Sequence, residues 1–307
     1  MTAASRTVAR YFKAAGDATL GALTAGMLRA IRLTDRKRMA NVAGGFMRAV
    51  GPRLKEHEIG RANLAAAFPE KSAAEIDTIL RGVWDNLGRV AAELAHIDRL
   101  QIFRPEEHGA GDILYTPETY DRFQELRRDG KPALIFAAHL GNWELPALVA
   151  TKYELDTTVL YRRPNMGAVS DAVIRIRQGS MGRLVATGLD APVRLARVLE
   201  AGGHVGMLVD QHYVNGADVT FFGRPCKANP FLARLARQVD APIHGARVVR
   251  LPDSHHFRVD LTPPIAPARD AEGRIDIAGT MQAITSVIEG WVREYPEQWL
   301  WVHRRWR

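Results

Sequence analysis

The stretch ALIFAAHLGNWE, residues 133–144, decides the fold that this sequence predicts. Its first half is a short apolar run of strand length, and its second half is polar and opens with His139. Similar apolar runs follow at 157–161 (TTVLY) and 204–210 (HVGMLVD), and amphipathic stretches of helix length separate the runs. Strands that alternate with helices form a largely parallel sheet covered on both faces. The sequence therefore predicts an α/β fold with a mainly parallel central sheet flanked by helices.

Segments on either side of this pattern complete the expected fold. The runs 243–250 (IHGARVVR) and 256–261 (HFRVDL) are close enough in sequence to pair as a hairpin that extends the sheet. A last helix is expected at about 276–294. Residues 36–50 are typical of another helix, and two more follow from residue 59. These helices predict a helical amino-terminal layer.

The two helices after residue 59 are separated at Phe68-Pro69. Ser72 is followed three residues later by Glu75, which is the pattern of a capping box at a helix start. We therefore expect the second helix to begin just after Ser72.

Positive charge is concentrated at the amino-terminal end. The 307 residues include 42 Lys and Arg and 34 Asp and Glu, a net charge of +8. Residues 1–61 hold twelve basic and four acidic residues, so the rest of the chain is balanced. A basic segment suits either nucleic acid or an anionic bilayer. Basic and aromatic residues alternate only in the tail WVHRRWR (301–307), so we expect no nucleic-acid partner, and this tail fits the headgroup level of a membrane.

Residues 14–28 are too short and too rich in Ala, Gly and Thr to predict a membrane-spanning helix. Asp17 and the lack of a small-residue cleavage site argue against a cleavable signal peptide. The large apolar residues nearby recur at helical spacing and form one stripe: Leu20, Leu23, Met27 and Ile31. A basic helix with one apolar stripe is typical of an interfacial helix, but a solvated helix packed on the body has the same pattern. We expect a basic, membrane-interfacial arm at 1–58 and one α/β domain at 59–307.

Cysteine and histidine usage gives no sign of a metal site. Cys226 is the only cysteine, which excludes a disulfide framework and a cysteine-ligated cluster within one chain. His255 and His256 are neighbours in an expected strand, where their side chains point to opposite faces. No metal is therefore expected.

The residues that follow the first strand are the first candidates for a site, because parallel sheets carry their chemistry at the carboxyl ends of strands. Glu144 could accept a hydrogen bond from one ring nitrogen of His139 and leave the other nitrogen free as a general base. Gly141 allows close backbone approach to a reacting carbonyl group, whose oxyanion nearby N–H groups could stabilise. No Ser or Cys adjoins these residues, which favours acyl transfer with the acceptor's own hydroxyl as nucleophile. A purely structural histidine is the alternative.

HLGNWE resembles the H-x4-D/E motif of the lysophospholipid/glycerolipid acyltransferase superfamily. Its residues are most similar to the form of this motif in the lipid A biosynthesis (lauroyl/myristoyl) acyltransferase family. Other segments resemble that family in the same order. They are RANLAAAFPEKS (61–72), LYRRPN (160–165), LVDQ (208–211) with FFG (221–223), and PEQWLWVHRRWR (296–307). The resemblance therefore extends from about residue 59 to the carboxyl terminus.

This resemblance implies roles for individual residues. His139 would deprotonate the acceptor hydroxyl, and Glu144 would hold the imidazole and stabilise the imidazolium. Gly141 and Asn142 would shape the oxyanion region.

Two further pairs belong to the expected site. Arg162 and Arg163 would bind a phosphate of the lipid acceptor or acyl carrier, which suits bidentate donors. The family has Tyr-Arg-Pro where this chain has YRRP, so which arginine takes the role stays open. Asp210 and Gln211 end an expected strand and would line the same cleft, although an aspartate there also suits a simple turn. Additional arginines fit either a phosphate-binding surface or a solvated face: Arg175, Arg177 and Arg183.

The resemblance implies transfer of a fatty acyl chain from acyl-carrier protein or acyl-CoA to a hydroxyl of a phosphorylated lipid A precursor, without metal or organic cofactor. One alternative keeps this chemistry and changes the acceptor to another lysolipid or glycolipid. A third interpretation is a non-catalytic, basic membrane-binding protein. The expected location is the cytoplasmic face of the bacterial inner membrane, as a peripheral or monotopic protein on the lipid surface.

Overall fold

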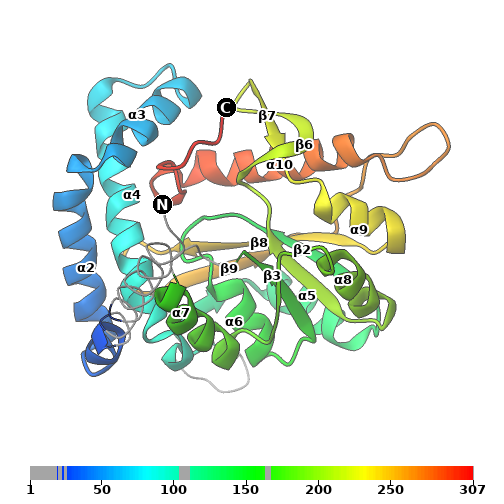
Figure 1. Ribbon diagram of the computed structural model, residues 1–307, viewed down its shortest axis with the longest axis horizontal. Helices are drawn as coiled ribbons and strands as arrows, with labels where there is room; N and C mark the ends of the chain where they lie inside the picture. The colour runs from blue at the N-terminus through cyan, green and yellow to red at the C-terminus, as the bar shows by residue number, and fades with distance from the viewer. Residues whose placement is uncertain (1–18, 20–22, 24–25, 104–110, 163–166, 307) are drawn as a thin grey trace, which may run out of the picture.

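The computed structural model describes residues 19, 23, 26–103, 111–162 and 167–306 (Figure 1). Seven strands form one sheet in the spatial order β1-β9-β8-β2-β5-β3-β4. These strands are β1 Ile113–Tyr115, β2 Ala133–Ala137, β3 Thr157–Tyr161, β4 Arg183–Ala186, β5 His204–Leu208, β8 Ile243–Arg250 and β9 Phe257–Leu261. All neighbouring pairs are parallel except β8 and β9, which form an antiparallel hairpin. The predicted mainly parallel sheet is confirmed, and so is the hairpin.

Helices cover both faces of this sheet, because successive side chains of a strand point to opposite faces. In β2, Leu134 and Phe136 enter one hydrophobic core, whereas Ala133 and Ile135 face the other. Helices α8, α9 and α10 contribute to the first core, and α5, α6 and α7 to the second. Their bounds are α5 Pro117–Arg128, α6 Leu145–Lys152, α7 Gly167–Ser180, α8 Ala191–Glu200, α9 Phe231–Val239 and α10 Ile277–Glu294.

A second, two-stranded sheet lies beside α10 and was not predicted from the sequence (Figure 1). It consists of β6 His212–Phe221 and β7 Arg224–Ala228. The backbone turns between them at Phe222 (φ 53°) and Gly223 (φ 66°). Phe221 and Phe222 are buried, which places both in the core.

The amino-terminal layer consists of α2 Arg36–Val50, α3 Lys55–Ala67 and α4 Ala73–Leu94, as predicted. The Ser72 capping box is present: Glu75 N–H donates to the Ser72 hydroxyl (3.3 Å), and Ser72 N–H donates to the Glu75 carboxylate (2.8 Å). Helix α2 packs closely on α4, since a Cβ at Gly88 would lie 2.2 Å from the Ala43 carbonyl oxygen. Among the described residues, no helix has both the length and the apolarity to cross a bilayer.

Candidate active site

His139 lies on the turn after β2, and Asp210 lies two residues beyond the end of β5. These two strands are parallel neighbours, so their carboxyl ends bring the two residues to the same edge of the sheet. The His139 ring Nδ1 lies 2.7 Å from one oxygen of Asp210, and the His139 backbone N–H donates to the other at 2.8 Å. The structure therefore joins two of the predicted site residues directly.

Asp210 is a buried carboxylate, with 3% of its surface exposed. The indole N–H of Trp299 donates to it as well, at 2.8 Å. Burial opposes its ionisation, but the attraction of His139 and the hydrogen bonds from His139 and Trp299 outweigh this effect and hold the pKa of Asp210 below its ordinary value. Asp210 is therefore an anion that can orient the imidazole of His139.

An ionised Asp210 places the imidazole proton on Nδ1 of His139, which leaves a lone pair on Nε2. Gln211 contacts this nitrogen, with 3.3 Å between Gln211 Nε2 and His139 Nε2. The His139 side chain is 16% exposed, so a substrate can reach the ring. The expected grouping of Asp210 and Gln211 with His139 is what the structure shows.

Glu144 does not make the hydrogen bond to His139 that the sequence predicted. Asp210 occupies the position at Nδ1, and Glu144 instead accepts two hydrogen bonds from Arg177 in α7. One of these joins Arg177 Nε and Glu144 Oε2 at 2.9 Å. Glu144 is 8% exposed and lies at the amino end of α6. The ion pair therefore connects the turn that carries His139 (residues 138–144) to α7. The sequence correctly placed Glu144 at the start of a helix. A spacing of five residues from His139 does not determine in which direction the Glu144 side chain points.

Gly141 and Asn142 shape the turn, and each uses a donor within the protein. The Gly141 N–H donates to the Gln298 carbonyl oxygen at 3.0 Å, and the Asn142 amide donates to Glu93 in α4 at 2.9 Å. Asn142 has no exposed surface. Gly141 has φ 57°, and a Cβ there would lie 2.3 Å from the Val248 carbonyl oxygen. The two residues therefore position the turn, and the Gly141 N–H and this amide hydrogen of Asn142 do not point to a substrate oxyanion.

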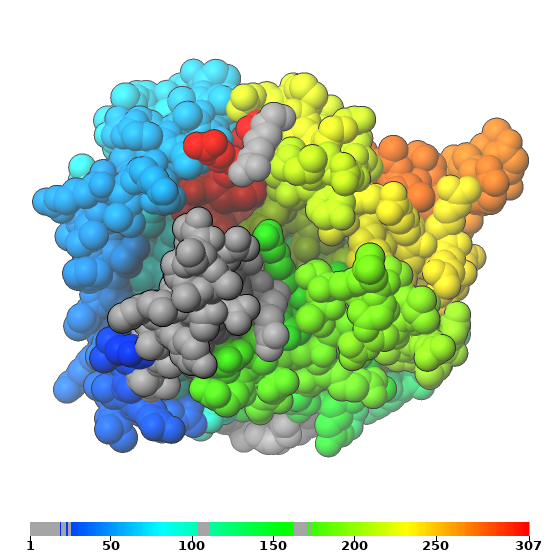
Figure 2. Space-filling model, in the orientation of Figure 1, coloured from blue at the N-terminus to red at the C-terminus, as the bar shows by residue number. Residues whose placement is uncertain are grey.

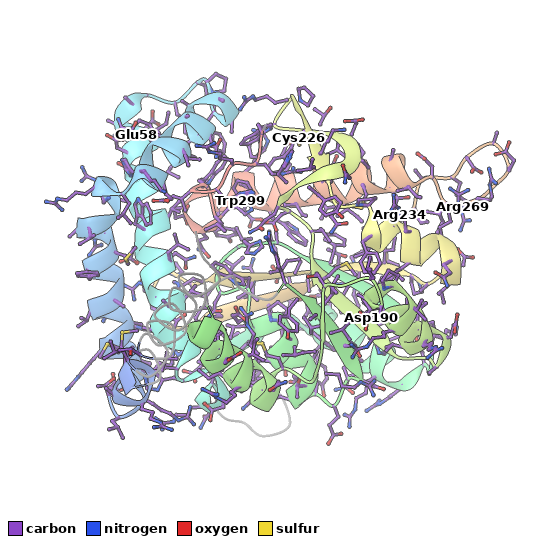
Figure 3. All side chains as sticks on the ribbon, in the orientation of Figure 1. Glu58, Asp190, Cys226, Arg234, Arg269 and Trp299 are labelled. Atoms are coloured by element: carbon purple, nitrogen blue, oxygen red, sulfur yellow. The ribbon has the colours of Figure 1, made fainter. Side chains whose placement is uncertain are left out.

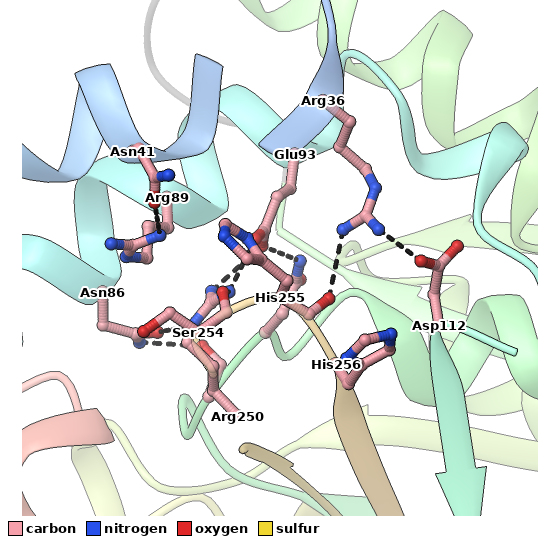
Figure 4. Close-up of polar contacts among 12 residues, drawn as sticks. Arg36, Asn41, Asn86, Arg89, Glu93, Asp112, Arg250, Ser254, His255 and His256 are labelled. Atoms are coloured by element: carbon pink, nitrogen blue, oxygen red, sulfur yellow. Dashed lines mark hydrogen bonds and ion pairs between the residues drawn. The ribbon is translucent and has the colours of Figure 1, made fainter. Parts of the chain in front are cut away.

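Arg250 and Glu93 form a buried ion pair (Figure 4). Arg250 of β8 donates to both oxygens of Glu93 at 2.6 and 3.0 Å, and its Nε donates to Asn86 at 2.9 Å. Asn86 in turn donates to the Gly141 carbonyl oxygen at 2.9 Å. This network links α4 and β8 to the turn. The network could not be predicted from the sequence, because Asn86, Glu93 and Arg250 belong to a helix and a strand far apart in the chain and carry no motif.

The predicted phosphate-binding arginines are placed only in part. Arg162 is exposed just after β3, whereas Arg163 lies outside the described residues. Arg175 is exposed, but Arg183 forms an ion pair with Asp156. The described part of the chain also contains no cluster of three or more His, Cys, Asp or Glu side chains that could hold a metal ion.

The carboxyl-terminal segment packs into the body of the protein, contrary to the expectation that WVHRRWR (301–307) fits the headgroup level of a membrane. Trp299, Trp301 and Arg305 are 1%, 0% and 2% exposed. The Leu300 N–H donates to the His139 carbonyl oxygen at 3.1 Å, so this segment lies directly against the catalytic turn. Trp299 lies in the interior beside α10 (Figure 3). Tryptophan and arginine suit membrane interfaces and buried clusters alike, and composition alone did not separate the two.

The fold and the site together define a class of enzyme. A histidine held by a buried carboxylate at the edge of a parallel sheet suits a transfer reaction that activates a substrate hydroxyl, because no Ser, Thr or Cys side chain of the described residues bonds to the His139 ring. The family model for bacterial lipid A biosynthesis acyltransferases matches residues 11–307, and the chain belongs to this family. No curated protein matches it significantly. The protein is therefore an acyltransferase of lipid A biosynthesis.

The left-handed backbone of Gly141 makes a first prediction. Gly141→Ala adds both backbone strain and a contact with the Val248 carbonyl oxygen, so it should displace the turn and reduce acyl transfer at least tenfold. Gly130 has φ 65° and open space where a Cβ would lie, which makes Gly130→Ala the matched control. The control should lower the free energy of unfolding by about 1–2 kcal/mol, and Gly141→Ala by about 1–3 kcal/mol more. Equal losses in denaturant unfolding would contradict this account.

His303 makes a second prediction, because burial lowers its pKa to about 4 even though the negative charge of Asp210 acts in the opposite direction. Between about pH 6.5 and 4 the unfolded chain binds a proton at this residue that the folded chain does not bind, so the free energy of unfolding should fall as the pH is lowered. Between pH 7.5 and pH 5, His303→Gln should remove about 2 kcal/mol of this loss. Urea unfolding at pH 7.5 and pH 5 measures it. An unchanged pH dependence in the variant means that His303 is not the group responsible.

Proposed function

We propose that this enzyme transfers a fatty acyl chain from an acyl thioester to a hydroxyl of a phosphorylated lipid A precursor, with His139 as general base. The observation that carries the proposal is the hydrogen bond between His139 Nδ1 and the buried carboxylate of Asp210, at 2.7 Å. It leaves Nε2 as the proton acceptor on the accessible side of the ring. Membership of the family supports the lipid acceptor.

The proposed reaction proceeds by direct transfer. His139 Nε2 takes the proton of the acceptor hydroxyl while the hydroxyl oxygen attacks the thioester carbonyl carbon. The new C–O bond forms an ester, the C–S bond breaks, and the thiolate leaving group takes the proton from the imidazolium. Asp210 stabilises the imidazolium that exists between these two proton transfers. No acyl-enzyme intermediate is needed.

Glu144 retains a place in this proposal through Arg177. Their ion pair is mostly buried, with side-chain exposures of 9% and 20%, so it fixes the start of α6 relative to α7. Removing one partner of such a pair leaves an uncompensated charge in a region of low water content. Glu144 is therefore proposed to maintain the geometry of the catalytic turn, and the orienting contact to His139 is assigned to Asp210.

The donor is proposed to be acyl-carrier protein, with acyl-CoA as the second possibility. Both donors end in the same phosphopantetheine thioester, so the chemistry at His139 is common to them. Arg162 is exposed beside the end of β3 and is available for a phosphate of the donor or the acceptor. Substituting Arg162 and Arg163 one at a time would show which of the two arginines binds the phosphate.

The enzyme is further proposed to bind the cytoplasmic surface of the inner membrane through α2. This helix forms an outer edge of the molecule (Figure 2). Val42 and Phe46 lie one turn apart on its outer face and are 65% and 62% exposed, with the exposed Arg38 one turn before them. Apolar side chains bordered by cations suit the headgroup region of an anionic bilayer. The bound enzyme would then meet its lipid acceptor in the same leaflet.

Acyl transfer by purified enzyme tests the reaction. His139→Ala and Asp210→Asn should each lower kcat by roughly 10² to 10⁴-fold with folding intact, because each removes part of the general base. Mass spectrometry of the product from acyl-carrier protein or acyl-CoA, with a lipid A precursor or other lysolipids, identifies donor and acceptor. Near-native transfer by His139→Ala would rule out the general-base role. Transfer only to another lysolipid would replace the proposed acceptor.

The role of Glu144 is tested in the same assay. We expect Glu144→Gln and Arg177→Gln to reduce kcat with little change in donor KM, and the double variant to be no worse than the more impaired single variant. Additive losses would contradict an action through the ion pair.

Vesicle flotation tests the membrane face. Val42→Asp with Phe46→Asp should lower binding to vesicles of neutral and anionic phospholipid at least tenfold, because each change removes apolar area and adds a repelled charge. Val193 in α8 is 56% exposed and gives the matched control Val193→Asp, which should bind as the wild type does. Equal binding by all variants would exclude α2 as the contact.

A further inference from the structure

Trp299 contacts the same carboxylate oxygen that receives the backbone N–H of His139. Both donors lie 2.8 Å from Oδ2 of Asp210, while Oδ1 faces the His139 ring. The carboxylate is therefore held in the plane and rotation that its bond to the imidazole needs. We propose that Trp299 is a positioning residue of the active site, which acts on His139 through Asp210. The inference rests on the proposed function, because it assigns a role in that same reaction.

The backbone around Trp299 is fixed to the catalytic turn. On one side, the Gln298 carbonyl oxygen accepts the Gly141 N–H at 3.0 Å. On the other side, the Leu300 N–H donates to the His139 carbonyl oxygen at 3.1 Å. These two bonds keep the Trp299 indole in register with His139. A shift of the carboxyl-terminal segment would therefore move the indole and the turn together.

Aromatic neighbours fix the orientation of the indole. The Trp299 ring packs edge to face against Trp301 at 4.7 Å and against Phe221 at 5.5 Å between ring centroids. Such packing restricts rotation of the ring. The single polar atom of the side chain, Nε1, is thereby directed at Asp210, where its hydrogen bond to a charged acceptor is strong.

Other groups around Asp210 do not replace this donor. The ionisable side chains with an electrostatic effect on Asp210 are His139, His303 and Arg305. The His303 Nε2 atom accepts from the His212 N–H, and Arg305 donates to the Lys227 carbonyl oxygen at 2.7 Å. Among the described residues, the hydrogen bonds to Asp210 come from His139 and Trp299. Loss of the indole N–H consequently leaves Oδ2 with one donor.

The chain offers a matched control in Trp301. It is 0% exposed, belongs to the same aromatic cluster, and donates its indole N–H at 2.7 Å to the Pro296 carbonyl oxygen. Trp299→Phe and Trp301→Phe therefore remove the same atoms and one indole hydrogen bond each. Only the first change reaches Asp210.

The experiment compares both variants with the wild type in thermal unfolding and in acyl transfer as a function of pH. We expect similar losses of Tm, but a roughly ten- to hundredfold lower kcat for Trp299→Phe alone, with the KM for the donor unchanged. The acid limb of its pH profile should move to higher pH, because Asp210 without the indole attracts a proton more strongly. Trp301→Phe should stay within about threefold of wild-type kcat, with an unshifted profile. Equal kcat losses in both variants, or wild-type kcat and pH profile in Trp299→Phe, would overturn the proposal.

A second readout separates this inference from the proposed function. The NMR signal of the His139 Nδ1 proton reports its hydrogen bond to Asp210 without any substrate. It should shift in Trp299→Phe and stay in place in Trp301→Phe. A wild-type enzyme that transfers no acyl chain would refute the proposed function, whereas an unshifted signal in Trp299→Phe would refute the positioning role.

Discussion

The buried carboxylate of Asp210 is the constraint on which the site depends. An unpaired charge at 3% exposure would be strongly destabilising, so its burial requires donors from other parts of the chain. They come from the turn after β2 and from Trp299, which is 89 residues away in sequence. The parallel pairing of β2 with β5 brings His139 and Asp210 together. The carboxyl-terminal segment, which carries Trp299, packs against both of them. The sheet and the carboxyl-terminal segment therefore both hold His139 and Asp210 in place.

The ion pair of Glu93 and Arg250 also supports the turn that carries His139. A buried ion pair adds little stability compared with well-packed apolar side chains, because both charges lose their hydration. Its value here is geometric. Glu93 accepts from the Asn142 amide, and Asn86 links Arg250 to the Gly141 carbonyl oxygen. The turn that carries His139 is thus bonded on one side to α4 and β8 and on the other to the carboxyl-terminal segment. Such a scaffold is rigid without being especially stabilising.

The sequence predicted most of the sheet and half of the site, for physical reasons that differ between residues. Apolar runs such as 133–137 are buried on both faces, and this composition is visible in the chain. Asp210 and Gln211 were found because strand ends converge at one edge. The partner of Glu144 was not found, since a spacing of five residues fixes a place in the turn and says nothing of a guanidinium 33 residues away. The contact of Trp299 with Asp210 could not be predicted, because it depends on how the carboxyl-terminal segment folds back, which tertiary packing determines.

The H-x4-E spacing gains a different physical meaning from these contacts. The ring of its histidine bonds to the Asp210 carboxylate from the segment after β5, while its own carboxylate, Glu144, accepts hydrogen bonds from Arg177. Arg177 lies on α7, and the segment between β3 and α7 carries Arg162 and Arg163. Through Glu144, the motif therefore joins the proton-accepting side of the site to the segment expected to bind phosphate. The Glu144 carboxylate, five residues after His139, accepts two hydrogen bonds from the guanidinium of Arg177, a pairing that suits this planar donor. In the proposed reaction, this turn would set the distance between His139 and the bound substrate, which a transfer without a covalent intermediate must keep short.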